Sequence, residues 1–290
     1  MSLRIAILST VGVSLLGNIE RSLDKLGLSQ RAREVFGSRD KPPSRLPIDD
    51  ELQGLFDKWA SEGGEVLEDV VRVLSSDPVG FSAELNSLVA FLKSLPARHV
   101  ISELRLQFYP TDTGTSRFSA RALIEYLRRY GDKFRESAGL PANARLVIDD
   151  PITLRGFGRG VEWFREGLSD LMDKFVNNIV SLRRDGYKVV VNPTGGFKPE
   201  SAYLTVMAML AGAWRIIYIH ETFRDIVELP ILPITINPRY ANLLSRNPTV
   251  NELTSEGLDP RDLEDNGIVE IRDGEVIVKE WFKKLMQTQG

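Results

Sequence analysis

The residues best suited to chemistry lie in the segment 192–198, where an apolar run is followed by two adjacent glycines and a lysine. The run 188–191 is short and rich in valine, which predicts a buried strand. Gly195 and Gly196 let the backbone turn sharply and bring N–H groups close to a ligand. Pro199 then suits the first position of a helix. The free N–H groups and the positive end of such a helix favour an anion, most often phosphate.

Lys198 adds a positive charge at the same turn. The sequence Thr-Gly-Gly-Phe-Lys-Pro is not a Walker P-loop, which needs four residues between its first glycine and its Gly-Lys pair. The two glycines could instead serve packing in a plain strand-to-helix turn, and Lys198 could be a solvated lysine of the first helical turn. The spacing alone leaves both interpretations open.

A second set of candidates follows the first apolar run of the chain, residues 4–10. Ser9 and Thr10 end this predicted strand, and Ser14 precedes a helix predicted over 15–26. Ligands of open parallel sheets bind at the carboxyl ends of the strands, where these hydroxyls would lie. Alternatively, Ser14 only caps the helix, which is a common role for serine.

The strand predicted over 103–109 is followed by small hydroxyl residues in the segment 110–116, among them Thr111. Arg105 and Arg117 are the nearby cations. We therefore expect a third hydroxyl-rich turn at the same edge of the sheet.

Acidic and histidine side chains offer a competing site. Asp149 and Asp150 follow the strand predicted over 145–148, and His220 and Glu221 end a later strand. Together they could bind Mg²⁺ or Mn²⁺, and His220 could act as a general base. Helix capping by the aspartates and a structural role for the histidine are the simpler interpretation, which we prefer. We expect no metal and no cofactor.

Five strand–helix alternations predict an α/β fold: a Rossmann-like, mostly parallel, doubly wound sheet with helices on both faces. Residues 28–48 predict a loop, and about 49–95 predict a helical insertion of three helices. Residues 229–238 predict an extended connector or an edge strand. The predicted strands cover 4–10, 103–109, 145–148, 188–191 and 214–220.

Composition limits the possible classes. The 290 residues carry a formal net charge of -3, with no cysteine and two histidines. Disulfides, Fe–S clusters and cysteine zinc sites are therefore excluded, and the absence of cysteine fits a cytoplasmic protein. No apolar run approaches the roughly 18 residues of a membrane helix, and we see no signal peptide. We expect no membrane partner.

The C-terminal part predicts a separate small domain over 226–290, after a first domain over 1–225. Three short helices precede a hairpin around Asp273-Gly274 and a last helix, an order typical of a winged helix. Residues 239–290 hold seven Lys/Arg and ten Asp/Glu. Because DNA binding requires positive charge, we favour a structural or dimer-forming role over DNA binding.

Three segments together resemble a known family: STVGVSLLGN at 9–18, AELNSL at 83–88 and NPTGGFK at 192–198. They are similar to the CRISPR-associated Rossmann-fold (CARF) proteins, closest to the archaeal ring nucleases, over most of residues 3–222. The resemblance implies a homodimer with one pocket across its two-fold axis, which binds a cyclic oligoadenylate, usually cyclic tetra-adenylate. It further implies metal-independent cleavage to linear di-adenylate with 2′,3′-cyclic phosphate ends, which switches off type III CRISPR signalling.

The resemblance also implies the site. Ser14 would orient the attacking 2′-hydroxyl and Lys198 would neutralise the phosphate, because positioning and electrostatics can supply most of such a barrier reduction. The family usually has Gly-Thr-Ser in its first loop, whereas this chain has Gly12-Val13-Ser14 and lacks one hydroxyl. The residues expected to contact the ligand are Ser9, Thr10, Gly12, Val13, Arg105, Thr111, Asn192, Thr194, Gly195 and Gly196.

Two other functions stay open. The pocket could sense the ring without cutting it, while the C-terminal winged helix regulates a partner or DNA. The chain could also be an ordinary nucleotide-binding enzyme.

Overall fold

A six-stranded sheet forms the centre of the computed structural model, which describes the chain except for residues 1, 98, 157–162, 197, 220–224 and 288–290. The strand order is β3-β2-β1-β4-β5-β6, in which β6 alone is antiparallel to its neighbour. The mostly parallel α/β sheet is therefore confirmed. The edge strand β6 shares only Leu229 with the predicted segment 229–238, which otherwise forms a connector up to α11 (Pro238–Leu244). The strands are β1 (Ser2–Val11), β2 (Val100–Pro110), β3 (Arg145–Ile148), β4 (Lys188–Asn192), β5 (Arg215–Ile219) and β6 (Ile226–Leu229).

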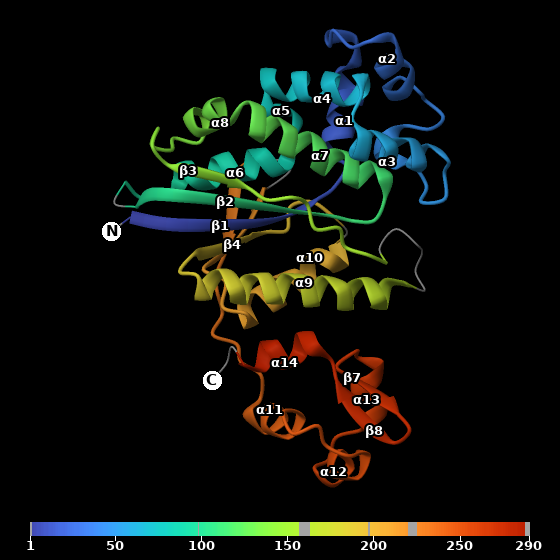
Figure 1. Ribbon diagram of the computed structural model, residues 1–290, viewed down its shortest axis with the longest axis vertical. Helices are drawn as coiled ribbons and strands as arrows, with labels where there is room; N and C mark the ends of the chain where they lie inside the picture. Colours follow the sequence, from blue (N-terminus) through green and yellow to red (C-terminus); the bar gives the residue numbers. More distant parts are fainter. Residues whose placement is uncertain (1, 98, 157–162, 197, 220–224, 288–290) are drawn as a thin grey trace.

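Helices cover both faces of this sheet (Figure 1). Because side chains alternate along a strand, Ile5 and Ile7 of β1 pack on one face and Ala6 and Leu8 on the other. The first face carries α1 (Ser14–Ser22), α2 (Gln30–Phe36), α3 (Leu52–Glu62), α4 (Glu65–Ser76), α5 (Pro78–Phe81), α6 (Ala83–Ser94), α7 (Gly114–Arg129) and α8 (Gly131–Ser137). The second carries α9 (Phe164–Arg184) and α10 (Lys198–Leu210).

Two details differ from the sequence prediction. Residues 28–48, predicted as a loop, contain α2 and a 3-10 turn at Pro43–Arg45. The side chain of Ser29 caps α2 by accepting a hydrogen bond from the Ala32 N–H at 3.3 Å. The insertion holds four helices rather than three, because Asp77 caps the additional single turn α5.

The ends of the strands meet at one edge of the sheet. In the parallel pairs, Val11 of β1 lies beside Pro110 of β2, and Ser9 lies beside Asn192 of β4. The helices after β1 and β2 cover one face, whereas those after β3 and β4 cover the other. The connections from the neighbouring strands β1 and β4 therefore lead to opposite faces of the sheet. Such a switch point opens a crevice at the carboxyl edge, where ligands of such sheets bind.

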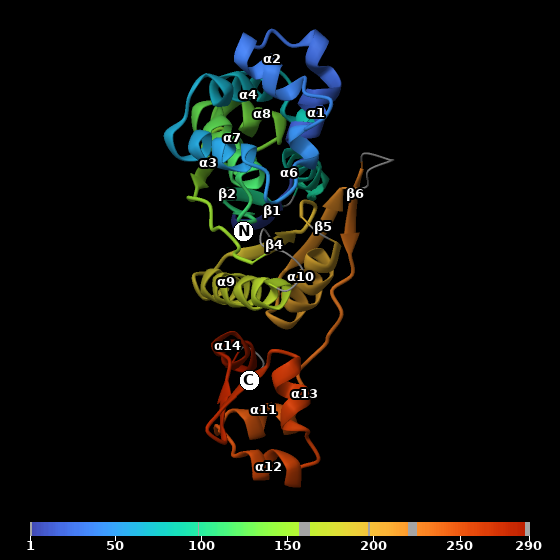
Figure 2. The same ribbon diagram turned by 90° about the vertical axis from the view of Figure 1, so that its right-hand side faces the viewer.

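The C-terminal elements form a layer beyond α9, on the side of this helix that faces away from α1 (Figure 2). They are α11 (Pro238–Leu244), α12 (Val250–Ser255), α13 (Pro260–Asp265), β7 (Val269–Arg272), β8 (Glu275–Val278) and α14 (Glu280–Gln287). The predicted three helices, hairpin and last helix are thus confirmed. Trp281 and Leu285 of α14 share an apolar cluster with Phe175 of α9. The division at residue 226 into two domains stays a prediction.

Within the described ranges, no helix combines the length and apolar character needed to cross a bilayer.

Candidate functional site

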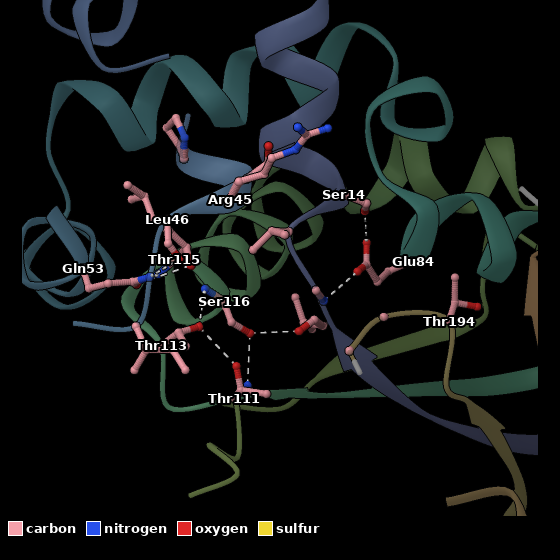
Figure 3. A pocket seen from close by; sticks show the side chains of 18 residues that line it. Ser14, Arg45, Leu46, Gln53, Glu84, Thr111, Thr113, Thr115, Ser116 and Thr194 are labelled. Atoms are coloured by element: carbon pink, nitrogen blue, oxygen red, sulfur yellow. Dashed lines mark hydrogen bonds between the residues drawn. The ribbon is translucent and has the colours of Figure 1, made fainter. Parts of the chain in front are cut away.

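A cavity of about 390 Å³ opens at the carboxyl edge of the sheet, between the turns that follow β1, β2 and β4 (Figure 3). A strap at residues 43–48 and one residue of α3 close it on the side of the helical insertion. Its lining is rich in hydroxyl groups and small residues: Val11, Gly12, Val13, Ser14, Pro43, Ser44, Arg45, Leu46, Ile48, Gln53, Glu84, Thr111, Thr113, Thr115, Ser116, Thr194, Gly195 and Gly196.

The glycines of the first and third turns allow these two turns to pack against each other. A Cβ atom on Gly195 would lie 2.5 Å from the amide nitrogen of Gly12 and 2.9 Å from the carbonyl oxygen of Thr10. A Cβ on Gly12 would lie 3.2 Å from the amide nitrogen of Gly196, whose φ is 98°. The close approach predicted for the backbone of the glycine turn is therefore present. In the structure, this backbone approaches the turn after β1.

Replacing Gly195 by alanine should separate the two turns, because its Cβ would meet backbone atoms that cannot move alone. We expect the free energy of unfolding to fall by about 1–3 kcal/mol, which is the usual cost of overpacking. Thermal unfolding measures this loss. Gly54→Ala is the matched control, since no atom lies within 4 Å of a Cβ built there, and it should leave stability equal or slightly higher. Equal melting temperatures for both variants would contradict this account.

Ser14 lies in the cavity and does not cap α1. The N-cap of α1 is Val13, which makes no side-chain cap, and Ser14 is the first helical residue. The Ser14 hydroxyl instead donates a hydrogen bond to Glu84 Oε2 at 3.2 Å. The capping interpretation is therefore wrong, and the hydroxyl belongs to the wall of the cavity (Figure 3).

Glu84, the second residue of α6, is a residue of this site that the sequence prediction missed, as it also missed Arg45 and Gln53. Its side chain is 1% exposed, and its two oxygens accept from the Gly12 N–H at 3.1 Å and from the Ser82 hydroxyl at 2.9 Å, besides Ser14. The segment AELNSL contains it, but an acidic residue in a first helical turn also suits the helix dipole. Only the tertiary fold brings this carboxylate to the turn that follows β1.

Three predicted ligand contacts are buried behind the lining of the cavity and do not line it themselves. Ser9, Thr10 and Asn192 are each at most 1% exposed. The Asn192 side-chain amide donates to the Ser9 hydroxyl at 3.1 Å and to the Ser87 hydroxyl at 2.7 Å, and the Thr10 hydroxyl donates to the Gly195 carbonyl. These residues connect β1, β4 and α6, so the structure gives them a supporting position rather than a place in the lining.

The turn after β2 reaches the same cavity, as predicted from its hydroxyl residues. The Ser116 hydroxyl accepts from the Thr111 N–H at 3.0 Å and donates to the Val11 carbonyl at 2.8 Å. The Gln53 side chain of α3 accepts from the Thr115 N–H at 3.0 Å. The third turn contributes Thr194, whose hydroxyl accepts from the Ile219 N–H at 3.3 Å.

The structure does not bring Arg105 to the cavity. Its guanidinium forms a bidentate ion pair with Asp149, at 2.6 and 2.9 Å, which raises the pKa of the arginine. Asp150 pairs with Arg128 at 2.8 Å, and this hydrogen bond lowers the pKa of the aspartate. Both aspartates of the competing metal site thus have arginine partners.

The rest of the competing site, His220 and Glu221, lies outside the described residues. Within the residues that the structure does describe, no group of three or more histidine or acidic side chains could hold a metal ion.

The charge of the cavity rests on few side chains. Arg45 of the strap is the cation among the described lining residues. Lys198 begins α10, directly after the glycine turn, and its side chain lies outside the described part of the structure.

The fold and the cavity together define a class. A mostly parallel sheet with a hydroxyl- and glycine-lined cavity at its switch point is the architecture of a Rossmann-like protein. Residues 79–232, slightly more than half of the chain, match the family described as CRISPR-associated protein (Cas_APE2256). The chain belongs to this family, and its likeness to the CARF-type CRISPR-associated proteins is confirmed. The match includes Glu84 and the turn at 192–198 and leaves out the first turn.

Proposed function

We propose that this protein is a ring nuclease. It binds a cyclic oligoadenylate, cyclic tetra-adenylate, in a pocket shared by two protomers and cleaves it without metal to linear di-adenylate with 2′,3′-cyclic phosphate ends. This reaction switches off type III CRISPR signalling. The observation that carries the proposal is the meeting of Ser14 with the Gly195-Gly196 turn in one cavity of a CRISPR-associated protein.

The size of the cavity supports a shared pocket. About 390 Å³ lies near the lower end of the roughly 300–1,000 Å³ that small-molecule sites occupy, which is small for four nucleotides. Two copies of the cavity facing each other across a two-fold axis would offer both the volume and two identical sets of groups, matching the symmetry of the ring.

The exposed side of α10 supports a homodimer. Leu204, Met207 and Ala208 of this helix are buried against the sheet, yet Tyr203 and Val206 on its outer side are 46% and 45% exposed. Large apolar side chains that are exposed side by side on a helix often mark a contact with another chain. We infer that a second copy of the chain covers this face of the helix that follows the glycine turn.

Val206→Glu tests this face. A charge at the centre of an apolar contact is costly to bury, so we expect the dimer to dissociate and ring binding to weaken together. Light scattering coupled to gel filtration measures the mass. Val100→Glu is the control, because Val100 is also exposed, at 54%, but lies at the amino end of β2, opposite the cavity. A dimer that persists in Val206→Glu would contradict this face, and a monomeric native protein would contradict the shared pocket.

The proposed chemistry needs position and charge stabilisation. The ribose 2′-oxygen attacks the adjacent phosphorus and forms the new O2′–P bond, and the 2′-hydroxyl proton passes to water. The P–O5′ bond breaks, and the leaving 5′-oxygen takes a proton from water. Ser14 orients the 2′-hydroxyl, and Lys198 with the amides of Gly195 and Gly196 stabilises the charge on the phosphoryl oxygens. Fixed donors aimed at developing charge commonly provide the largest part of such catalysis.

The direct test is incubation of the purified protein with cyclic tetra-adenylate in excess EDTA. We expect linear di-adenylate with 2′,3′-cyclic phosphate ends. Absence of linear product at stoichiometric protein would overturn the proposal. Tight binding without turnover would instead support a sensor, whereas binding of mononucleotides but not of the ring would support an ordinary nucleotide-binding enzyme.

We further propose that residues 226–290 form a separate winged-helix-like domain with a structural or dimer-forming role. Three short helices, a hairpin and a final helix support the likeness to a winged helix. The excess of acidic residues over 239–290 makes DNA binding unfavourable.

A further inference from the structure

The buried carboxylate of Glu84 fixes the direction of the hydrogen bond that Ser14 can make to a ligand. An ionised carboxylate only accepts hydrogen bonds, and a serine hydroxyl has one hydrogen and two acceptor positions. The hydrogen of Ser14 is therefore used on Glu84, at 3.2 Å. The Ala83 N–H approaches one acceptor position of the same oxygen at 3.4 Å. One acceptor position is left for the cavity.

The neighbours of Glu84 keep it in this role. The Gly12 N–H can only donate, and it points at Oε1 of Glu84. The Ser82 hydroxyl accepts from the Leu85 N–H at 3.1 Å, so it gives its hydrogen to Oε2 of Glu84. Since the three donors come from the first turn and from the start of α6, the carboxylate is held in one orientation against the cavity wall (Figure 3).

This arrangement distinguishes between two parts of a nucleotide. A phosphate oxygen has no hydrogen to offer, so it gains nothing from a serine that can only accept. A ribose 2′-hydroxyl has a hydrogen to donate. The ribose 2′-hydroxyl therefore belongs at the Ser14 side of the cavity.

We propose that Glu84 is a positioning residue that makes Ser14 an obligate acceptor, so that the pocket selects a ligand with a hydrogen-bond donor at the ribose 2′-position. This inference rests on the proposed function, since it names how the same cavity recognises ribose at the bond to be cut. Glu84 itself takes no part in bond formation or cleavage.

Two cyclic tetra-adenylate analogues test the direction of this bond. The 2′-amino analogue can donate a hydrogen bond, whereas the 2′-fluoro analogue cannot. We expect the native protein to bind the amino analogue about tenfold more tightly, which corresponds to one or two neutral hydrogen bonds at the usual 0.5–1.5 kcal/mol each. Isothermal titration calorimetry gives both dissociation constants.

Glu84→Gln should remove this preference. The amide of the new side chain can donate to Ser14, which then has its own hydrogen free for the ligand, so the amino-to-fluoro affinity ratio should fall to about threefold or less. Because both analogues are measured on each variant, the differences in sugar conformation between them cancel in the comparison. Ser14→Ala should also abolish the preference. The result for this variant does not depend on the orientation that a buried glutamine side chain adopts.

Asp69→Asn is the matched control. Asp69 is 5% exposed and accepts from the Ser29 N–H at 2.8 Å, and it does not line the cavity. The same carboxylate-to-amide change there should leave the affinity ratio unchanged. A ratio near the native value in Glu84→Gln or in Ser14→Ala would overturn the role of Glu84. A native protein that cleaves the ring but binds both analogues equally would overturn it too, while the ring nuclease proposal would stand. Failure to bind any ring would overturn both.

Discussion

Ser14→Ala is expected to slow ring cleavage by about 10²–10³, the effect of losing one well-placed group in an active site. The hydroxyl lies in the cavity, hydrogen-bonded to Glu84 at 3.2 Å, so removing it takes away the acceptor that holds the 2′-hydroxyl in line with the phosphorus. Single-turnover rates at saturating protein measure the chemical step apart from binding.

A second serine on the same helix is the control for this prediction. Ser22 is the last residue of α1 and Ser14 is the first, and Ser22 does not line the cavity. Ser22→Ala should cleave at the native rate. If Ser14→Ala also keeps the full rate, Ser14 does not orient the nucleophile, even where ring cleavage itself is observed.

Lys198→Ala is expected to lower the cleavage rate by a similar factor of about 10²–10³. The lysine is proposed to stabilise the phosphoryl oxygens most strongly in the transition state, where their negative charge is largest. The lysine begins α10 directly after the glycine turn, where the helix dipole acts in the same direction. We expect the maximal rate to fall more than the affinity for the ring.

Lys188 provides a matched control, since it begins β4, the strand that precedes the glycine turn, and so lies at the end of that strand away from the turn. Lys188→Ala should change neither rate nor affinity. Lys198→Arg keeps the charge but alters its geometry, so its rate should lie between those of the native protein and Lys198→Ala. A cleavage rate that is unaffected in Lys198→Ala would assign the charge stabilisation to another group.

The sequence was sufficient to predict most of the fold. Apolar runs such as 4–10 and 188–191, each followed by small residues and a helix, specify parallel strands through local patterns. The loop predicted over 28–48 was wrong, because the short helix α2 depends on the Ser29 cap and on burial of Ala32 and Phe36 in the core. Short helices carry too weak a periodicity to be recognised without that context.

For the site, the sequence determined which turns carry hydroxyls, glycines and a lysine, because turn chemistry is local. Only the tertiary structure decided which of these groups line the cavity: Ser14 does, whereas Ser9 and Asn192 hydrogen-bond beneath it and Arg105 pairs with Asp149. It also brought Glu84 to Ser14, 70 residues away along the chain. A hydrogen bond between such distant segments depends on how α6 packs against the end of β1, and no local pattern in either segment encodes that contact.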